Sequence, residues 1–236
     1  MRPITTLFLI QSLDGKISTG DTNELDVDKD YPKIVGVREG VHQYYDLERQ
    51  TDRVSFNTGK VQAKIGVNTR DLKTVRKSDV DFVIVDNMPH LNAHGTEWFA
   101  IRAGVLYIVT NNKNHPAFEL QKKYDNIRIL YYDEIDFVDV FRRFSEEFGI
   151  ERVTVQTGGT LNATLLRLKL IDRVSIVIAP CLIGGKNTPS LVSGESLHTE
   201  AELPHIKALK LTKIQQLKDN YVLLEYDVIN DTQVLI

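Results

Sequence analysis

The sequence predicts an α/β fold in which a mostly parallel central sheet is flanked by helices and followed by a C-terminal antiparallel hairpin. Short apolar runs rich in β-branched residues alternate with segments of helical periodicity, a pattern typical of parallel sheets. The last two strand-like runs, 208–217 and 221–228, are separated only by Lys218, Asp219 and Asn220. Such a short polar turn between two strands favours a hairpin.

The expected strands are short apolar runs bounded by turn residues, which is the pattern of strands buried on both faces. They lie at 7–10, 53–56, 81–86, 105–110, 127–131, 153–156 and 173–180. The helical segments show apolar residues three and four apart, and two of them carry end signals, Pro116 in a first turn and Gly149 after a last one. Helices are expected at 37–50, 60–65, 116–124 and 137–148, and again from Thr160 onward. The polar, acidic segment 19–32 is expected to be a flexible surface loop.

Composition limits the class of protein. The chain has 236 residues, no repeat and no low-complexity linker, so a single domain over 1–236 is expected. Its net charge of −3, with basic and acidic residues well mixed, argues against nucleic acid as a partner. Cys181 is the single cysteine, which excludes an internal disulfide and fits a reducing cytoplasm. The apolar run at 7–10 is too short for a signal peptide or a membrane span.

The most informative segment runs from Val153 to Leu168, where a strand leads into Gly158 and Gly159 and then into a helix. Glycines allow a sharp turn and a close approach of the backbone, and Thr160 is expected to cap the helix. A strand, a glycine turn and a helix N-terminus together form a site for an anion, usually a phosphate. The alternative is a tight β–α connection with no ligand.

A second glycine turn, 57–60, also follows a strand. It is not a nucleotide-binding loop of the Gly-x-x-x-x-Gly-Lys-Ser/Thr type, because Val54 and Val61 occupy positions that need glycine and Ser or Thr. It is either a simple turn or a second backbone wall of a cofactor cleft. His90, His94 and Glu97 are expected to share a loop, yet no further histidine pair or second cysteine supports a metal there, and no metal is expected.

At these residues the chain resembles the reductase domain of bacterial and archaeal riboflavin biosynthesis, the RibD C-terminal domain family, which has a dihydrofolate-reductase-like fold. The resemblance covers almost the whole chain. It rests on the segments 12–17, 57–60, 155–161 and 170–185, and the last two in tandem are fairly specific. A true dihydrofolate reductase is disfavoured, because the only tryptophan, Trp98, is far from the first strand.

The resemblance implies an NADPH-dependent reduction of a ribosylaminopyrimidine phosphate, with hydride delivered to the ring-opened ribosylamine, and a homodimer built on the C-terminal strand pair. In the family the glycine turn cradles the phosphates of NADPH. The expected cofactor contacts are Thr58, Gly59, Gly158, Gly159, Thr160, Leu161 and Asn162. The expected substrate contacts are Ser12, Asp14 and Lys64, with Asp14 as the catalytic candidate that orients the substrate and the loop 12–20 as a lid.

The chain departs from the family pattern at three positions. Thr157 stands where the family usually has glutamate, Phe8 where it often has lysine, and Lys64 about where it has aspartate. A lysine in place of a carboxylate inverts the local charge. The zinc-deaminase half is absent, since its signature needs cysteines that the chain lacks. Two alternatives therefore stay open: a reductase of the same fold with another pterin-like or carbonyl substrate, and a non-catalytic nucleotide- or flavin-binding module.

Overall fold

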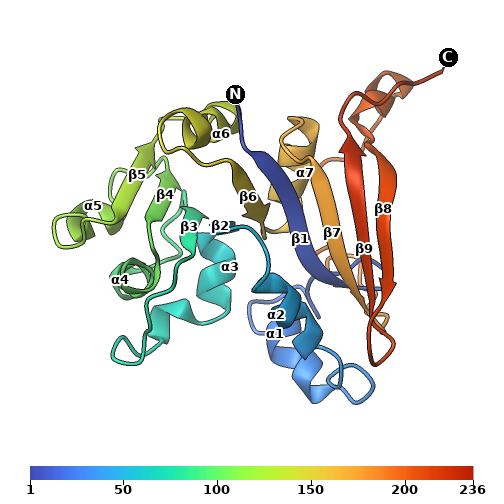
Figure 1. The fold of residues 1–236 in the computed structure, drawn as a ribbon, viewed down its shortest axis with the longest axis horizontal. Helices are drawn as coiled ribbons and strands as arrows, with labels where there is room; N and C mark the ends of the chain where they lie inside the picture. Colours follow the sequence, from blue (N-terminus) through green and yellow to red (C-terminus); the bar gives the residue numbers. More distant parts are fainter. Residues whose placement is uncertain (236) are drawn as a thin grey trace. The chain divides into compact units, whose positions relative to one another are not determined.

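The computed structural model describes residues 1–235, which form two compact units (Figure 1). The first unit comprises residues 1–3 and 52–157, and the second comprises 4–51 and the residues from 158 onward. The boundary between them falls inside the glycine turn, between Thr157 and Gly158.

The first unit is a parallel sheet with strand order β5-β4-β3-β2-β6. Its strands are β2 (Val54–Thr58), β3 (Asp81–Val85), β4 (Leu106–Thr110), β5 (Ile127–Tyr131) and β6 (Arg152–Val155). Its helices are α3 (Gly59–Lys64), η2 (Val67–Thr69), α4 (Ala93–Arg102), α5 (Ala117–Leu120) and α6 (Phe137–Glu146). All five residues of β4, and four of the five residues in each of β2 and β3, are buried, as expected for strands covered on both faces.

Every residue of β4 is buried, so this strand runs through the apolar interior of the first unit. One core of the unit forms around Ile84, Phe99, Leu106 and Ile108, where α4 packs on the sheet. The phenyl ring of Phe56 on β2 contacts the rings of Phe141 and Phe144, at centroid distances of 5.4 and 6.3 Å. These contacts attach α6 to the sheet through its apolar face.

The second unit has strand order β1-β7-β9-β8. β1 (Ile4–Ser12) and β7 (Arg173–Ala179) are parallel, whereas β9 (Val222–Ile229) is antiparallel to both β7 and β8 (Ala208–Gln216). The helices are α1 (Val27–Asp30), η1 (Tyr31–Lys33), α2 (His42–Glu48), α7 (Gly159–Arg167) and η3 (Glu200–His205). The expected α/β class with a mostly parallel sheet and a C-terminal antiparallel hairpin is thereby confirmed.

The hairpin turn has the backbone that its sequence favours. Asp219 and Asn220 have φ of +55° and +66°, and the Tyr221 amide donates to the Lys218 carbonyl at 3.2 Å. Two consecutive residues with positive φ match the right-handed twist of the flanking strands, and Asp and Asn tolerate that conformation better than most residues. The sequence therefore predicted the turn correctly, including its position.

Two expectations about local structure are wrong. The segment 19–32, expected to be a flexible loop, contains α1 and the start of η1, and its Val27 and Tyr31 are buried in the core of the second unit. The segment that carries His94 and Glu97, expected to be a loop, is α4. Its start is obscured in the sequence by Gly95, where a Cβ would lie 2.2 Å from the Asn68 side-chain oxygen and would displace that side chain.

Candidate functional site

The helix after the glycine turn begins two residues earlier than the sequence suggests. Gly158, with φ of −76° and ψ of 158°, is the N-cap of α7, and the expected cap Thr160 lies in the first turn with an exposed side chain. The first amides of a helix lack a partner within the helix. The backbone N–H groups of Gly159, Thr160 and Leu161 therefore mark the positive end of α7, where an anion is stabilised.

The two glycines of the turn have different surroundings. A Cβ added to Gly158 would meet no atom within 4 Å, so open space adjoins this residue. A Cβ added to Gly159 would lie 2.1 Å from the Ser190 carbonyl oxygen and 2.8 Å from Ser193 Oγ. Gly159 is thus required by the chain's own packing, and Gly158 is the glycine that leaves room for a ligand.

The segment 188–193 covers the start of α7 and also holds the loop that follows β1. The Ser193 amide donates to the Gly159 carbonyl at 3.0 Å, while the Leu191 amide donates to the Gly15 carbonyl at 3.0 Å. Lys16 pairs with Ser190 in an isolated antiparallel bridge. Within the second unit, the loop after β1, the segment 188–193 and the start of α7 form one connected group. Movement of the predicted lid, 12–20, would either break these hydrogen bonds or carry the segment 188–193 with it.

Asp14 joins two loops through both oxygens of its carboxylate. Ser12 Oγ donates to Oδ1 at 2.5 Å, the Ile183 amide donates to Oδ1 at 3.1 Å, and the Gly184 amide donates to Oδ2 at 2.6 Å. The Ser12 hydroxyl and these two amides lower the pKa of Asp14 to about 2, although desolvation opposes them. Asp14 is exposed and fully ionised at neutral pH, so it can accept a hydrogen bond but not donate a proton.

Asn162 contributes to the packing of this group. Its side chain is fully buried, its Nδ2 donates to the Leu191 carbonyl at 2.7 Å, and its backbone amide donates to the Gly158 carbonyl at 3.0 Å. Both of these donors are therefore engaged within the protein. The Asn162 side chain thus holds the segment 188–193, and its expected contact with a pyrophosphate stays a prediction.

The other expected cofactor residues, Thr58 and Gly59, belong to the first unit. The hydroxyl of Thr58 accepts from the Val61 amide at 3.4 Å and caps α3. A Cβ on Gly59 would lie 2.3 Å from the carboxyl carbon of Asp86. This glycine therefore allows the end of β2 to pass close to a carboxylate at the end of β3.

Asp86 is the centre of a buried polar cluster that the sequence did not reveal. Its carboxylate accepts from the amides of His90 and Leu91, at 3.1 and 3.0 Å. It also lies 3.0 Å from His90 Nδ1 and 3.2 Å from His115 Nε2. Burial alone would raise the pKa of Asp86, but the hydrogen bonds from His115, Leu91 and His90 outweigh it, and the pKa is lowered.

The three residues considered as metal ligands have separate partners. His90 contacts Asp86, His94 Nε2 lies 2.7 Å from the Arg70 carbonyl oxygen, and Glu97 accepts from Lys123 and Tyr124 at 2.6 Å. Among residues 1–235 there is no group of three or more His, Cys, Asp or Glu side chains placed to hold a metal ion.

The positions where the sequence departs from the family pattern have different environments. Phe8 is buried and stacks on Tyr44 with ring centroids 5.1 Å apart, so it belongs to the core of the second unit. Thr157 is also buried, at the end of the segment that follows β6. Lys64 is half-buried in the last turn of α3, in the first unit, whereas Ser12 and Asp14 are in the second.

The fold and the glycine turn define a class of protein: an α/β protein with a mostly parallel sheet, in which a glycine turn after a strand leaves the N-terminus of the next helix accessible to a ligand. The comparison of sequences shows the family. The model of the RibD C-terminal domain family matches residues 3–223, and the chain belongs to this family. The resemblance drawn from the motifs is thereby confirmed.

Two curated relatives match along nearly their whole length. The 2,5-diamino-6-ribosylamino-4(3H)-pyrimidinone 5′-phosphate reductase of Methanothermobacter thermautotrophicus is 26% identical over 227 residues, which cover 95% of each chain. The protein of the same name from Archaeoglobus fulgidus is 23% identical over 94% of this chain and 96% of its own.

Solved structures show the same fold. The structure of Acinetobacter baumannii RibD superimposes with a TM-score of 0.67 at 17% identity, over 98% of this chain. This chain spans only 59% of that longer protein. The riboflavin biosynthesis reductase Rib7 of Saccharomyces cerevisiae gives a TM-score of 0.59 at 18% identity, over 96% of this chain and 90% of its own. The dihydrofolate-reductase-like fold implied by the resemblance is thus confirmed.

Proposed function

We propose that the protein is an NADPH-dependent reductase that converts a ribosylaminopyrimidine 5′-phosphate into its ribityl form, as in riboflavin biosynthesis. The observation that carries the proposal is the match with curated reductases of this name over nearly the whole of both chains. The second unit supports it, because the accessible N-terminus of α7 is connected through the segment 188–193 to the loop that carries the ionised carboxylate of Asp14.

The residues around α7 fit a dinucleotide phosphate. Space adjoins Gly158, and the side chain of Thr160 is exposed at the first turn of α7. A pyrophosphate placed there would accept from first-turn amides and lie at the positive end of the helix dipole. We assign Gly158, Gly159, Thr160 and Leu161 to this contact. Bound NADPH would supply the hydride, and the protein supplies its orientation.

Asp14 has the protonation state of a group that orients the substrate. Its carboxylate is ionised over the physiological range, and the amides of Ile183 and Gly184 fix its position. A carboxylate oxygen accepts more than one hydrogen bond, so Asp14 can also accept from a hydroxyl of the substrate. The proton that completes reduction of an imine has to come from another donor, such as water.

Homodimer formation through the hairpin is the second part of the proposal. β8 forms the outer edge of its sheet beside β9 (Figure 1), and all nine of its residues are exposed. Leu211 and Ile214 are 50% and 68% exposed. An edge strand with unpaired backbone groups and exposed apolar residues is a template for pairing with a second chain. We expect two copies of the chain to pair through β8.

We also propose that the enzyme is cytoplasmic. No helix among residues 1–235 is both long and apolar enough to cross a membrane.

The dimer is tested by light scattering on the purified protein and on Ile214→Lys. We expect the wild type to have twice the mass of one chain and the variant to shift towards one chain, because a buried ammonium group at an interface is costly. Val138→Lys is the matched control, since Val138 is a half-exposed apolar residue on α6 in the other unit. A wild-type protein of single-chain mass, or equal effects of both variants, would contradict the interface.

The enzymatic proposal is tested first by titration with NADPH and NADH, followed by nucleotide fluorescence. We expect saturable binding of NADPH, and then NADPH oxidation on addition of a ribosylaminopyrimidine 5′-phosphate. The 2,5-diamino-6-ribosylamino-4(3H)-pyrimidinone 5′-phosphate for which the relatives are named is compared with the corresponding amino-uracil compound as substrate. Absence of binding by either nucleotide would overturn the cofactor assignment. NADPH binding without turnover of either compound would favour another substrate.

A further inference from the structure

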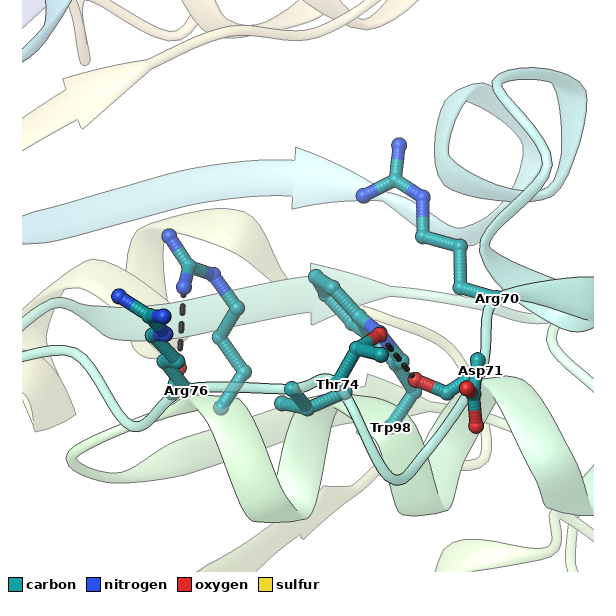
Figure 2. A pocket seen from close by; sticks show the side chains of 7 residues that line it. Arg70, Asp71, Thr74, Arg76 and Trp98 are labelled. Carbon is teal, nitrogen blue, oxygen red and sulfur yellow. Dashed lines mark hydrogen bonds between the residues drawn. The ribbon is translucent and has the colours of Figure 1, made fainter.

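A basic pocket lies on the first unit, between the segment 70–76 and α4. Its volume is about 390 Å³, and it is lined by Arg70, Asp71, Thr74, Val75, Arg76, Trp98 and Arg102. Figure 2 shows Trp98 on α4 facing this segment, with Arg70 and Arg76 towards its two ends. No lining residue belongs to the residues assigned above to the cofactor or the substrate. The volume is within the range of small-molecule sites, roughly 300–1,000 Å³.

Two guanidinium groups stack on the indole of Trp98. The guanidinium carbon of Arg70 lies 5.0 Å from the ring centroid and that of Arg102 lies 5.9 Å from it. Cation–π stacking uses the face of a guanidinium, whereas its N–H donors point outward in the plane of the group. Stacking of this kind restricts the arginine side chains, so they lose less entropy when an anion binds.

The backbone of the segment is fixed to α4 on the same side. Arg102 Nη1 donates to the Arg76 carbonyl oxygen at 3.0 Å, and the Ser78 amide donates to the Arg102 carbonyl at 2.8 Å. Thr74 Oγ1 donates to the Asp71 carbonyl at 3.1 Å. The side chain of Arg76 itself is exposed, so its charge is available at the mouth of the pocket without being needed for these contacts.

The pocket is positively charged although the chain has a net charge of −3. The pocket is lined by three guanidinium groups and by one carboxylate, that of Asp71. Asp71 Oδ1 accepts from the Lys73 amide at 2.9 Å. Within residues 1–235, neither Arg76 nor Arg102 forms an ion pair with a carboxylate. The charge of these two arginines is therefore not neutralised by the protein.

We propose that this pocket binds the phosphate monoester of a sugar or a nucleotide. Guanidinium groups match the geometry of phosphate oxygens and bind them through paired hydrogen bonds. The space is larger than one phosphate needs, and the indole offers an apolar surface for the rest of the ligand. The lining of this site shares no residue with those assigned above to the cofactor or the substrate.

The single tryptophan of the chain makes the site directly measurable, because the emission of Trp98 comes from the pocket. The purified protein is titrated at low salt with ribose 5-phosphate, adenosine 5′-monophosphate and inorganic phosphate, with adenosine as the unphosphorylated comparison. We expect a saturable change in emission with the two monoesters, weaker binding of inorganic phosphate, and no saturable change with adenosine.

Arg76→Gln is the test variant, since it removes a charge while keeping the backbone carbonyl that Arg102 uses. We expect its Kd for the monoesters to rise at least about tenfold, as loss of a charge-assisted hydrogen bond implies. Lys77→Gln is the matched control, because it removes the same charge from a neighbouring residue that does not line the pocket. Its Kd should stay within about twofold of the wild type. Thermal unfolding of both variants checks that the fold is retained.

Three outcomes would overturn the proposal. The first is the absence of any saturable change in Trp98 emission with the monoesters. The second is equal binding of inorganic phosphate and the monoesters, which would indicate attraction to charge alone. The third is equal weakening by Arg76→Gln and Lys77→Gln. The outcome does not depend on NADPH binding or turnover, so failure here is distinguishable from failure of the reductase assignment.

Discussion

The two adjacent glycines of the turn before α7 should respond differently to substitution. In Gly159→Ala, the new methyl carbon would lie 2.1 Å from the Ser190 carbonyl oxygen, which belongs to the backbone and cannot rotate away. The segment 188–193 would have to move by more than 1 Å, roughly, to restore an ordinary contact distance. In Gly158→Ala the methyl group would enter open space, and the φ of −76° suits any L-residue.

The expected cost follows from these contacts. Overpacking at Gly159 costs about 1–3 kcal/mol. Loss of the hydrogen bonds from Ser193 to Gly159 and from Asn162 to Leu191 would add about 1 kcal/mol each. Alanine gains at most about 1 kcal/mol over glycine within a helix, so the steric cost dominates. In Gly158→Ala, alanine is a poorer N-cap than glycine but also reduces the conformational freedom of the unfolded chain. These effects offset each other, so the free energy of unfolding changes by no more than about 1 kcal/mol.

Urea unfolding measures stability, and NADPH titration measures binding. We expect Gly159→Ala to lower the free energy of unfolding by about 2–4 kcal/mol, from the sum of the packing and hydrogen-bond losses. Gly158→Ala should stay close to the wild type in stability, and Gly158→Val should bind NADPH at least about tenfold more weakly, because its side chain fills the space beside the first turn of α7. Wild-type stability of Gly159→Ala would refute the packing argument. Wild-type NADPH affinity of Gly158→Val would refute the cofactor assignment.

Three further predictions concern stability and the role of Asp14. Asp86→Asn should destabilise the protein at pH 7 by about 1–3 kcal/mol, since one buried donor loses its acceptor. Because the pKa of Asp86 is lowered in the folded state, its stabilisation is fully present above the unfolded pKa of about 4 and is lost as pH falls through the lower pKa of the folded state. The difference in stability between wild type and variant in urea unfolding should therefore shrink as pH falls below about 4. Phe56→Ala should cost about 3–5 kcal/mol by the same assay, because it leaves a cavity against two aromatic rings; a cost below 1 kcal/mol would contradict this packing. Asp14→Asn should reduce kcat/KM about 10–100-fold while the Kd for NADPH changes less than threefold, and an unchanged kcat/KM would remove Asp14 from the reaction.

Much of the secondary structure could be predicted from the sequence because it depends on local patterns. Apolar runs with β-branched residues located the strands within a few residues, and Gly149, with φ of +65°, ends α6 where expected. The prediction failed at α4, where the apolar positions are buried on more than one face and Gly95 weakens the helical signal. It also failed at 19–32, where burial of Val27 and Tyr31 orders a polar segment.

The candidate site was only partly predictable. The motif identified the turn before α7, but glycine type alone did not distinguish Gly158 from Gly159. The loop around Asp14 was recognised, whereas its contacts with Ile183 and Gly184 depend on a segment far along the chain. The Asp86 cluster gave no signal, because its histidines come from loops after two different strands.

The sequence by itself determined the α/β class, the hairpin, the glycine turn and the family resemblance, since each is encoded in neighbouring residues or in a motif. Only the tertiary structure decided which glycine faces open space, that Asp14 is held ionised between two loops, and that three arginines line one pocket with Trp98. The physical reason is the same in each case. Steric exclusion, hydrogen-bond partners and local charge depend on residues that are distant in sequence and that folding brings within a few ångströms.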